Sequence, residues 1–150
     1  MSDTTAAAAL PFKPDPNDPG WLSWVPRDST RYNGFLERIL VRRDGPVGHV
    51  RMFPTHEHSN IADIVHGGVT LGFIDCAMFV TMRLIGDVGT GPALTLELST
   101  QFLGPGHLGR ALDAEVELLR ETRRLASLRG IVHQDADKVA AFSGTIRIQR

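Results

Sequence analysis

The longest apolar stretch of the chain, IVHGGVTLGFIDCAMFV, runs from Ile64 to Val80 and predicts a buried helix. It holds one carboxylate, Asp75, and apolar side chains would lie on almost every side of the helix. A helix from about Val65 to Ile85 would span roughly 30 Å. Because a helix that is apolar all round must be covered on most sides, we expect a strongly curled sheet or a second copy of the chain to cover it.

The segments on either side of this helix have strand patterns. Before it, FLERILVRR and VGHVRMF are separated by a strong turn signal, DGP, at residues 44–46. After it come ALTLELSTQF, RALDAEVELLR, RRLASLRGIVHQ and KVAAFSGTIRIQ, although residues 115–120 alone would also suit a helix. The alternation in the first of these predicts one face formed by Leu94, Leu96 and Leu98. This order predicts an α+β fold, with an antiparallel sheet wrapped around one long helix.

Composition indicates one domain with a short tail. Residues 1–20 combine alanines and prolines with Asp15, Asn17 and Asp18, which is typical of a flexible N-terminal tail. The remaining residues, 21–150, are enough for one domain with its own core.

Charge and cysteine content limit the partners. The formal net charge is −1, so no strong field would attract nucleic acid or an anionic membrane. The apolar stretch is shorter than the roughly 20 residues that a bilayer needs, and the N-terminus lacks the features of a signal peptide. The single cysteine, Cys76, excludes an intramolecular disulfide and fits a reducing compartment. We therefore expect a cytoplasmic protein that binds neither nucleic acid nor membrane.

The segment NIADIVHGG, from Asn60 to Gly68, followed by Asp75, resembles the signature of hotdog-fold thioesterases of the PaaI-like acyl-CoA thioesterase family. That signature is N-x-x-G-x-x-H-G-G, followed by an Asp eight residues after the first Gly of H-G-G. The resemblance extends from about Tyr32 to Arg150. One position departs from it, since Asp63 stands where the family usually has Gly; Asp63 would suit a helix cap.

The resemblance implies a hotdog fold in dimers that often pair again as tetramers. It also implies hydrolysis of an acyl-CoA thioester to an acid and free CoA, with no cofactor besides the CoA of the substrate. The Gly67 N–H would be the oxyanion donor and Asp75 the general base or nucleophile. The remaining implied site residues are Asn60, His66 and Thr95 near the thioester and Gly68, Arg123 and Arg124 in substrate binding.

Physical chemistry supports these roles but leaves simpler ones open. A helix N-terminus exposes unpaired N–H groups that can stabilise a developing oxyanion, yet glycines there often serve close packing alone. Asp75 on a buried helix needs a partner or a wet cleft, and a structural Asp would also meet that need. Asn60 is equally compatible with loop capping, Thr95 with an ordinary strand position, and the two arginines with solvated charge.

Spacing predicts a site shared between two chains. Eight helical residues separate Gly67 from Asp75 by roughly 12 Å, whereas reacting atoms approach to about 3–3.5 Å. Two antiparallel helices of a two-fold dimer would bring the Gly67 of one chain to the Asp75 of the other. The acyl group cannot be read from the sequence; we expect the helix face around Phe73, Ala77 and Met78 to shape its pocket.

Other motifs and functions remain alternatives. His56 and His58 are two residues apart, but no further ligands complete a metal site, so we expect none and interpret PTHEHSN as a polar loop. We interpret Cys76 as a core residue. The competing functions are a hotdog acyl-CoA dehydratase or hydratase and a non-catalytic CoA-ester binding protein.

Overall fold

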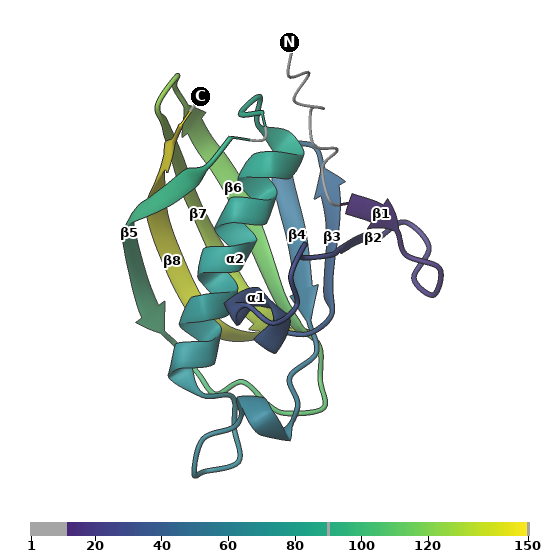
Figure 1. Ribbon diagram of the computed structural model, residues 1–150. Coiled ribbons are helices and arrows are strands. Elements are labelled where there is room, and N and C mark those ends of the chain that lie inside the picture. Colours follow the sequence, from purple (N-terminus) through teal and green to yellow (C-terminus); the bar gives the residue numbers. More distant parts are fainter. Residues whose placement is uncertain (1–11, 90, 150) are drawn as a thin grey trace.

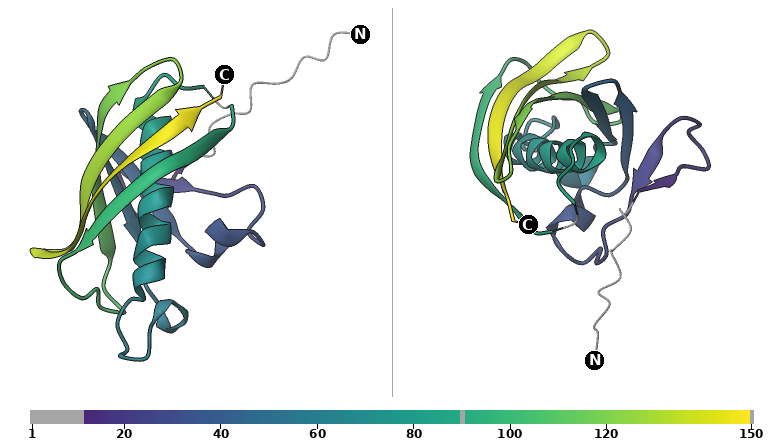
Figure 2. Two further views of the ribbon diagram at one scale, coloured as in Figure 1. Left: turned by 90° about the vertical axis from the view of Figure 1, so that its left-hand side faces the viewer. Right: turned by 90° about the horizontal axis from the view of Figure 1, so that it is seen from above.

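The computed structural model describes residues 12–89 and 91–149, in which an eight-stranded sheet wraps around the long helix α2, Gly67–Ile85 (Figures 1 and 2). Every neighbouring pair of strands is antiparallel, in the order β1-β2-β3-β4-β6-β7-β8-β5. The strands are β1 Phe12–Pro14, β2 Leu22–Trp24, β3 Ile39–Asp44, β4 Val47–Met52, β5 Ala93–Phe102, β6 Leu112–Glu121, β7 Leu125–Gln134 and β8 Asp137–Ile148. Two short helices precede α2: α1 (Tyr32–Phe35) and the 3-10 helix η1 (His56–His58). The predicted α+β architecture is confirmed.

The core lies between α2 and the concave face of the sheet. Phe73, Ala77 and Met78 are completely buried there. Gly144 of β8 lets the helix approach closely, because a Cβ at this position would lie 2.6 Å from the Met78 sulfur. Although α2 is long and apolar enough to cross a membrane, 61% of its most apolar window is buried against the rest of the chain, as expected for a core helix. The helix begins two residues later than predicted because His66 is extended.

The N-terminal boundary lies earlier than predicted. Residues 1–11 fall outside the described residues, but Phe12–Pro14 pairs with β2, which in turn pairs with β3. Asp15 fixes this hairpin, because its carboxylate accepts hydrogen bonds from Ser23 at 2.5 Å and from Arg38 at 2.9 Å. Residues 12–20 therefore belong to the edge of the sheet, and the expectation that the tail extends to residue 20 is wrong for this part.

The predicted alternation of β5 is interrupted by a β-bulge. Thr95 pairs with the buried Ile146, and Leu98 pairs with Gly144, which faces α2. The register shifts between Thr95 and Glu97, so Thr95 and Leu98 both face the helix although they are three residues apart. Leu94 and Leu96 are more than half exposed instead. The expectation of one shared leucine face is wrong, since an extra residue in a strand reverses the alternation that follows it.

Candidate active site

The first turn of α2 leaves one backbone donor open. His66 is the N-cap, and its Nδ1 accepts a hydrogen bond of 2.8 Å from the Gly68 N–H. The His66 carbonyl accepts from the N–H groups of Val69 and Thr70. Among the described residues, the Gly67 N–H has no acceptor. This donor therefore remains available at the positive end of the helix dipole.

The loop before α2 is organised by Asn60. Its Oδ1 accepts hydrogen bonds from the N–H groups of Ala62 at 2.9 Å and Ile64 at 3.3 Å. Its carboxamide nitrogen donates to no group in the described part of the chain, so it is free to face a ligand. Asp63 has a φ of 57°, which explains why Gly suits this position in the resembling family. The expectation that Asp63 caps the helix is wrong, because His66 occupies the cap.

Asp75 lies on the uncovered side of α2. It is exposed in the single chain, and its Oδ1 accepts a 2.7 Å hydrogen bond from the Thr95 hydroxyl. The β5 bulge aims Thr95 at the helix. Asp75 opens into a cavity of about 180 Å³, called the Asp75 pocket below, which is lined by Trp24, Asn33, Asp75, Cys76, Phe79, Ala93, Thr95 and Ile146. The carboxylate is thus oriented by one hydroxyl and remains accessible.

Cys76 does not act as a nucleophile in this pocket. It is buried, and burial together with the neighbouring Asp75 charge raises the pKa of its thiol to about 12. A thiol with such a pKa contains almost no thiolate at neutral pH. The assignment of Cys76 to the core is confirmed.

The predicted site residues form two groups within one chain. Asn60 and His66 line an open cavity of about 530 Å³ at the start of the helix, together with His56, Ser59, Ile61 and Asp63. Asp75 and Thr95 line the separate Asp75 pocket, two helical turns further on. A single chain therefore does not bring Gly67 and Asp75 to one point.

The two predicted CoA-binding arginines lie at the other end of the helix. Arg123 and Arg124 are exposed in the β6–β7 turn, whose Arg124 carbonyl accepts a hydrogen bond from Ile148. Glu121, just before this turn, accepts from the Asp87 N–H beyond the C-terminus of α2. A 19-residue helix is roughly 28 Å long. The arginines are therefore far from Gly67 and Gly68 of the same chain.

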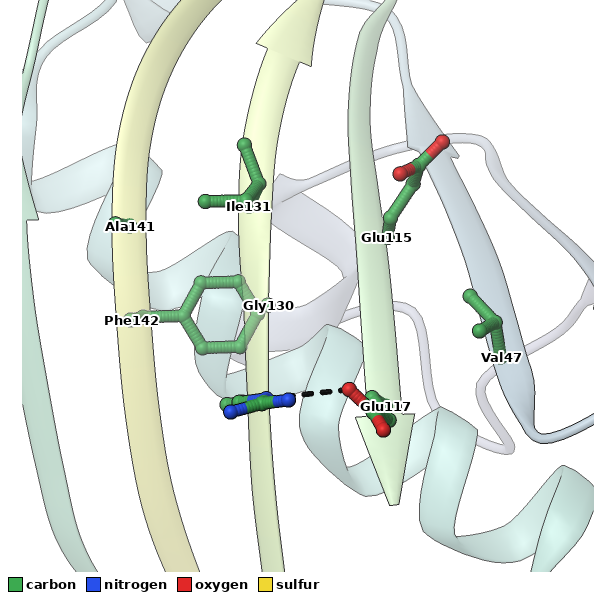
Figure 3. A pocket seen from close by; sticks show the side chains of 8 residues that line it. Val47, Glu115, Glu117, Gly130, Ile131, Ala141 and Phe142 are labelled. Atoms are coloured by element: carbon green, nitrogen blue, oxygen red, sulfur yellow. Dashed lines mark hydrogen bonds and ion pairs between the residues drawn. The ribbon is translucent and has the colours of Figure 1, made fainter. Parts of the chain in front are cut away.

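Two further features lie outside these groups. Residues of β4, β6, β7 and β8 line a pocket of about 390 Å³, which contains none of the predicted site residues. Figure 3 shows these side chains, with the ion pair between Arg129 and Glu117 among them. His58 is buried rather than part of a polar loop; its Nδ1 accepts from the Thr55 N–H, and its Nε2 donates to the Phe35 carbonyl.

Within residues 12–89 and 91–149, no three His, Cys, Asp or Glu side chains are placed to hold a metal ion.

The structure adds pocket residues that sequence reasoning did not identify. Trp24 and Asn33 reach the Asp75 pocket from the segment before β3. Phe73, Ala77 and Met78, which were expected to shape the acyl pocket, are buried against the sheet instead. The apolar helix residue that lines the pocket is Phe79. Its position four residues after Asp75 could have predicted this, because residues four apart lie on the same face of a helix.

Comparisons with known proteins identify the family of the chain. The family model of the Thioesterase superfamily matches residues 62–141. An Archaeoglobus fulgidus protein, whose name describes it as a candidate esterase, is 28% identical over 110 residues, or 73% of this chain and 68% of that protein.

Solved structures share the fold. The PaaI protein from the phenylacetic acid degradation operon of E. coli has a TM-score of 0.69 at 21% identity, over 83% of this chain and 86% of that one. Zebrafish thioesterase superfamily member 2 has a TM-score of 0.71 at 18% identity, over 81% and 89% of the two chains. At these identities the likeness shows the fold alone. Because the family model spans more than half of the sequence, the chain belongs to the thioesterase superfamily, and it has the hotdog fold of its PaaI-like structural neighbours.

Proposed function

We propose that the protein is a cytoplasmic acyl-CoA thioesterase that hydrolyses a thioester to a carboxylic acid and free CoA. It acts as a homodimer or a dimer of dimers, and it needs no cofactor other than the CoA of its substrate. The observation that carries this proposal is the open Gly67 N–H on the same apolar helix as an accessible carboxylate, Asp75. The superfamily membership supports the same reaction class.

The reaction follows from these two groups. The thioester oxygen accepts a hydrogen bond from the Gly67 N–H, which stabilises the negative charge that develops when the carbonyl carbon is attacked. Asp75 of the partner subunit takes a proton from the attacking water as general base, or attacks the carbonyl itself and is released by water. In the general-base route the C–S bond breaks as the tetrahedral intermediate collapses. In the nucleophilic route it breaks earlier, as the anhydride between Asp75 and the acyl group forms, and water then hydrolyses that anhydride. In both routes CoA leaves as a thiolate that takes up a proton. Thr95 holds one Asp75 oxygen and thereby orients the other.

Two chains are needed because Gly67, at the first position of the helix, and Asp75, in its own pocket, lie two helical turns apart in one chain. A partner whose α2 lies antiparallel would bring its own Asp75 toward Gly67. The same arrangement brings the partner's β6–β7 turn, with Arg123 and Arg124, toward the helix start of the first chain. There the arginines would bind the CoA phosphates, while Asn60, His66 and Gly68 shape the thioester end of the site.

The proposal is tested by release of free thiol from a panel of acyl-CoA esters. We expect turnover in the wild type and loss of nearly all of it in Asp75→Ala, which should remain folded because Asp75 is exposed in the single chain. A change in acyl unsaturation without thiol release would instead indicate a dehydratase or hydratase. Tight binding without any reaction would indicate a CoA-ester binding protein.

A second substitution isolates the oxyanion donor. Gly67 is the first helical residue, where proline is well tolerated, and His66, with ψ of 134°, already has the conformation required before proline. Gly67→Pro therefore removes the N–H while leaving the helix, and should lower kcat by roughly 10²- to 10³-fold. Gly67→Ala is the matched control, because it adds a Cβ and keeps the donor. Equal kcat values in the two variants would remove the Gly67 N–H from the mechanism.

A further inference from the structure

We propose that the Asp75 pocket holds the acyl group of the substrate, and that Asn33 selects compact acyl groups carrying a hydrogen-bonding substituent. This inference rests on the proposed function, because it places the thioester carbonyl beside Asp75. It names the substrate class of the same site: short-chain or single-ring acyl thioesters with a hydroxyl or comparable polar group, rather than unsubstituted or long alkyl chains.

The size of the pocket within one chain favours a compact acyl group. Its volume is about 180 Å³, and an apolar cavity of about 150 Å³ in another protein is known to bind benzene. The pocket therefore has room for roughly one six-membered ring or a short branched chain. Phe79, Ala93 and Ile146 supply apolar walls for such a group.

The polar groups of the pocket point to a second requirement. The Thr95 hydroxyl is already used by Asp75. The carboxamide of Asn33 has no hydrogen-bond partner among the described residues, although this half-buried side chain lines the pocket. An alkyl group placed against it would remove water from a donor and an acceptor without replacing their hydrogen bonds, which is costly. A hydroxyl on the acyl group would satisfy either of them.

Asn33 is held in place by contacts on both sides of α1. Tyr32 lies against α2 at Gly72, where its hydroxyl leaves no room for a Cβ. On the other side, the Phe35 carbonyl accepts a 2.7 Å hydrogen bond from the buried His58, whose ring also packs edge-on against Phe35. Figure 1 shows α1 lying beside the middle of α2. Because these contacts hold α1 on both sides, the Asn33 backbone has a supported position at the pocket, from which its carboxamide can discriminate between substrates.

The test compares matched thioesters that differ by one hydroxyl, butyryl-CoA with 3-hydroxybutyryl-CoA and benzoyl-CoA with 4-hydroxybenzoyl-CoA, together with decanoyl-CoA. In the wild type we expect kcat/KM to be higher for at least one hydroxylated member than for its partner, by roughly 10- to 100-fold, and decanoyl-CoA to be the poorest substrate. Asn33→Leu, which has a similar volume, should abolish the preference by lowering kcat/KM for the hydroxylated member. Asn17→Leu, on an exposed turn, is the matched control and should keep the preference.

The preference ratio does not depend on how much of a variant is folded, so a structural role of Asn33 alone would leave it unchanged. If Asn33→Leu does not fold, Asn33→Ala gives the same readout by removing atoms only. Faster hydrolysis of decanoyl-CoA, or an unchanged preference in the Asn33 variant, would overturn this inference while the thioesterase function stands. Absence of Asp75-dependent thiol release from every thioester would instead overturn the proposed function.

Discussion

The two glycines at the start of α2 have different physical roles. A Cβ on Gly68 would lie 3.0 Å from the His66 Nδ1, so a larger residue there would press on the ring that caps the helix. A Cβ on Gly67 would meet only Phe102, at an ordinary contact distance of 3.6 Å. The fold therefore favours glycine at position 68 for its cap but does not need glycine at position 67 for packing. What Gly67 provides is an open N–H with no side chain beside it.

A single strained residue in the preceding loop gives a prediction for stability. Asp63 has a left-handed backbone conformation, with φ of 57°. For an Asp this conformation costs up to about 1 kcal/mol of folding free energy. Asp63→Gly should therefore keep or raise the free energy of unfolding by up to about 1 kcal/mol, and Asp63→Val should lower it by about 1–2 kcal/mol. Urea unfolding measures both.

The matched control for this loop is Ala62→Gly. Ala62 is exposed and lies next to Asp63, but its φ is not positive. Here glycine only adds freedom to the unfolded chain, so the variant should lose about 0.4–1 kcal/mol. A loss of stability in Asp63→Gly equal to that in Ala62→Gly would show that the left-handed conformation is not retained in solution.

At the scale of elements, the regular pattern was readable from the sequence and the irregular parts were not. The central helix and the sheet strands flanking it follow from periodicity, because both are half-buried elements with one dominant repeat. The bulge in β5 is invisible to an alternation argument, yet it is what turns Thr95 toward Asp75. The hairpin around Asp15 and the pocket residue Asn33 lie in polar, proline-containing sequence, where tertiary contacts rather than local preference fix the chain.

The N-terminal hairpin should detach in acid. Asp15 has its pKa lowered from 3.8 to about 2, chiefly by the hydrogen bond from Ser23, with further contributions from backbone N–H groups and Arg38. Because the folded pKa lies below the unfolded one, this contribution to stability is fully present above about pH 4 and is lost as the pH falls through about 2. Tryptophan fluorescence from Trp21 and Trp24, at the edge of β2, should report the change.

Two variants separate this event from general acid unfolding. Asp15→Asn should show the hairpin already loosened at neutral pH and no step between pH 4 and 2. Asp28→Asn is the control, since the pKa of Asp28 is also lowered, chiefly by Thr30, but within an exposed turn that does not hold β1. Identical fluorescence titrations of wild type and Asp15→Asn would disprove the role of Asp15.

On the scale of the whole molecule, the single chain leaves an apolar edge uncovered. β5 pairs with β8 on one side and ends the sheet on the other. Three large apolar side chains of this strand are each more than half exposed: Leu94, Leu96 and Phe102. Leu71, on the uncovered face of α2, is exposed as well. An unpaired apolar edge strand is a template for pairing with another chain. A second copy at this edge would cover these side chains and complete the site described above.

Mixing two inactive variants tests whether the site is shared. Gly67→Pro removes the oxyanion donor and Asp75→Ala removes the carboxylate, so each homodimer should be inactive. In a mixed dimer, one site would combine the intact Gly67 of one chain with the intact Asp75 of the other, while the second site would lack both. Random co-refolding at a 1:1 ratio makes half of the dimers mixed, so about one quarter of the wild-type activity should return. If both groups instead acted within one chain, no active site could form and mixing would restore no activity. The control for recovery of active protein after refolding is wild type co-refolded with Asp75→Ala, which should show about half of the wild-type activity.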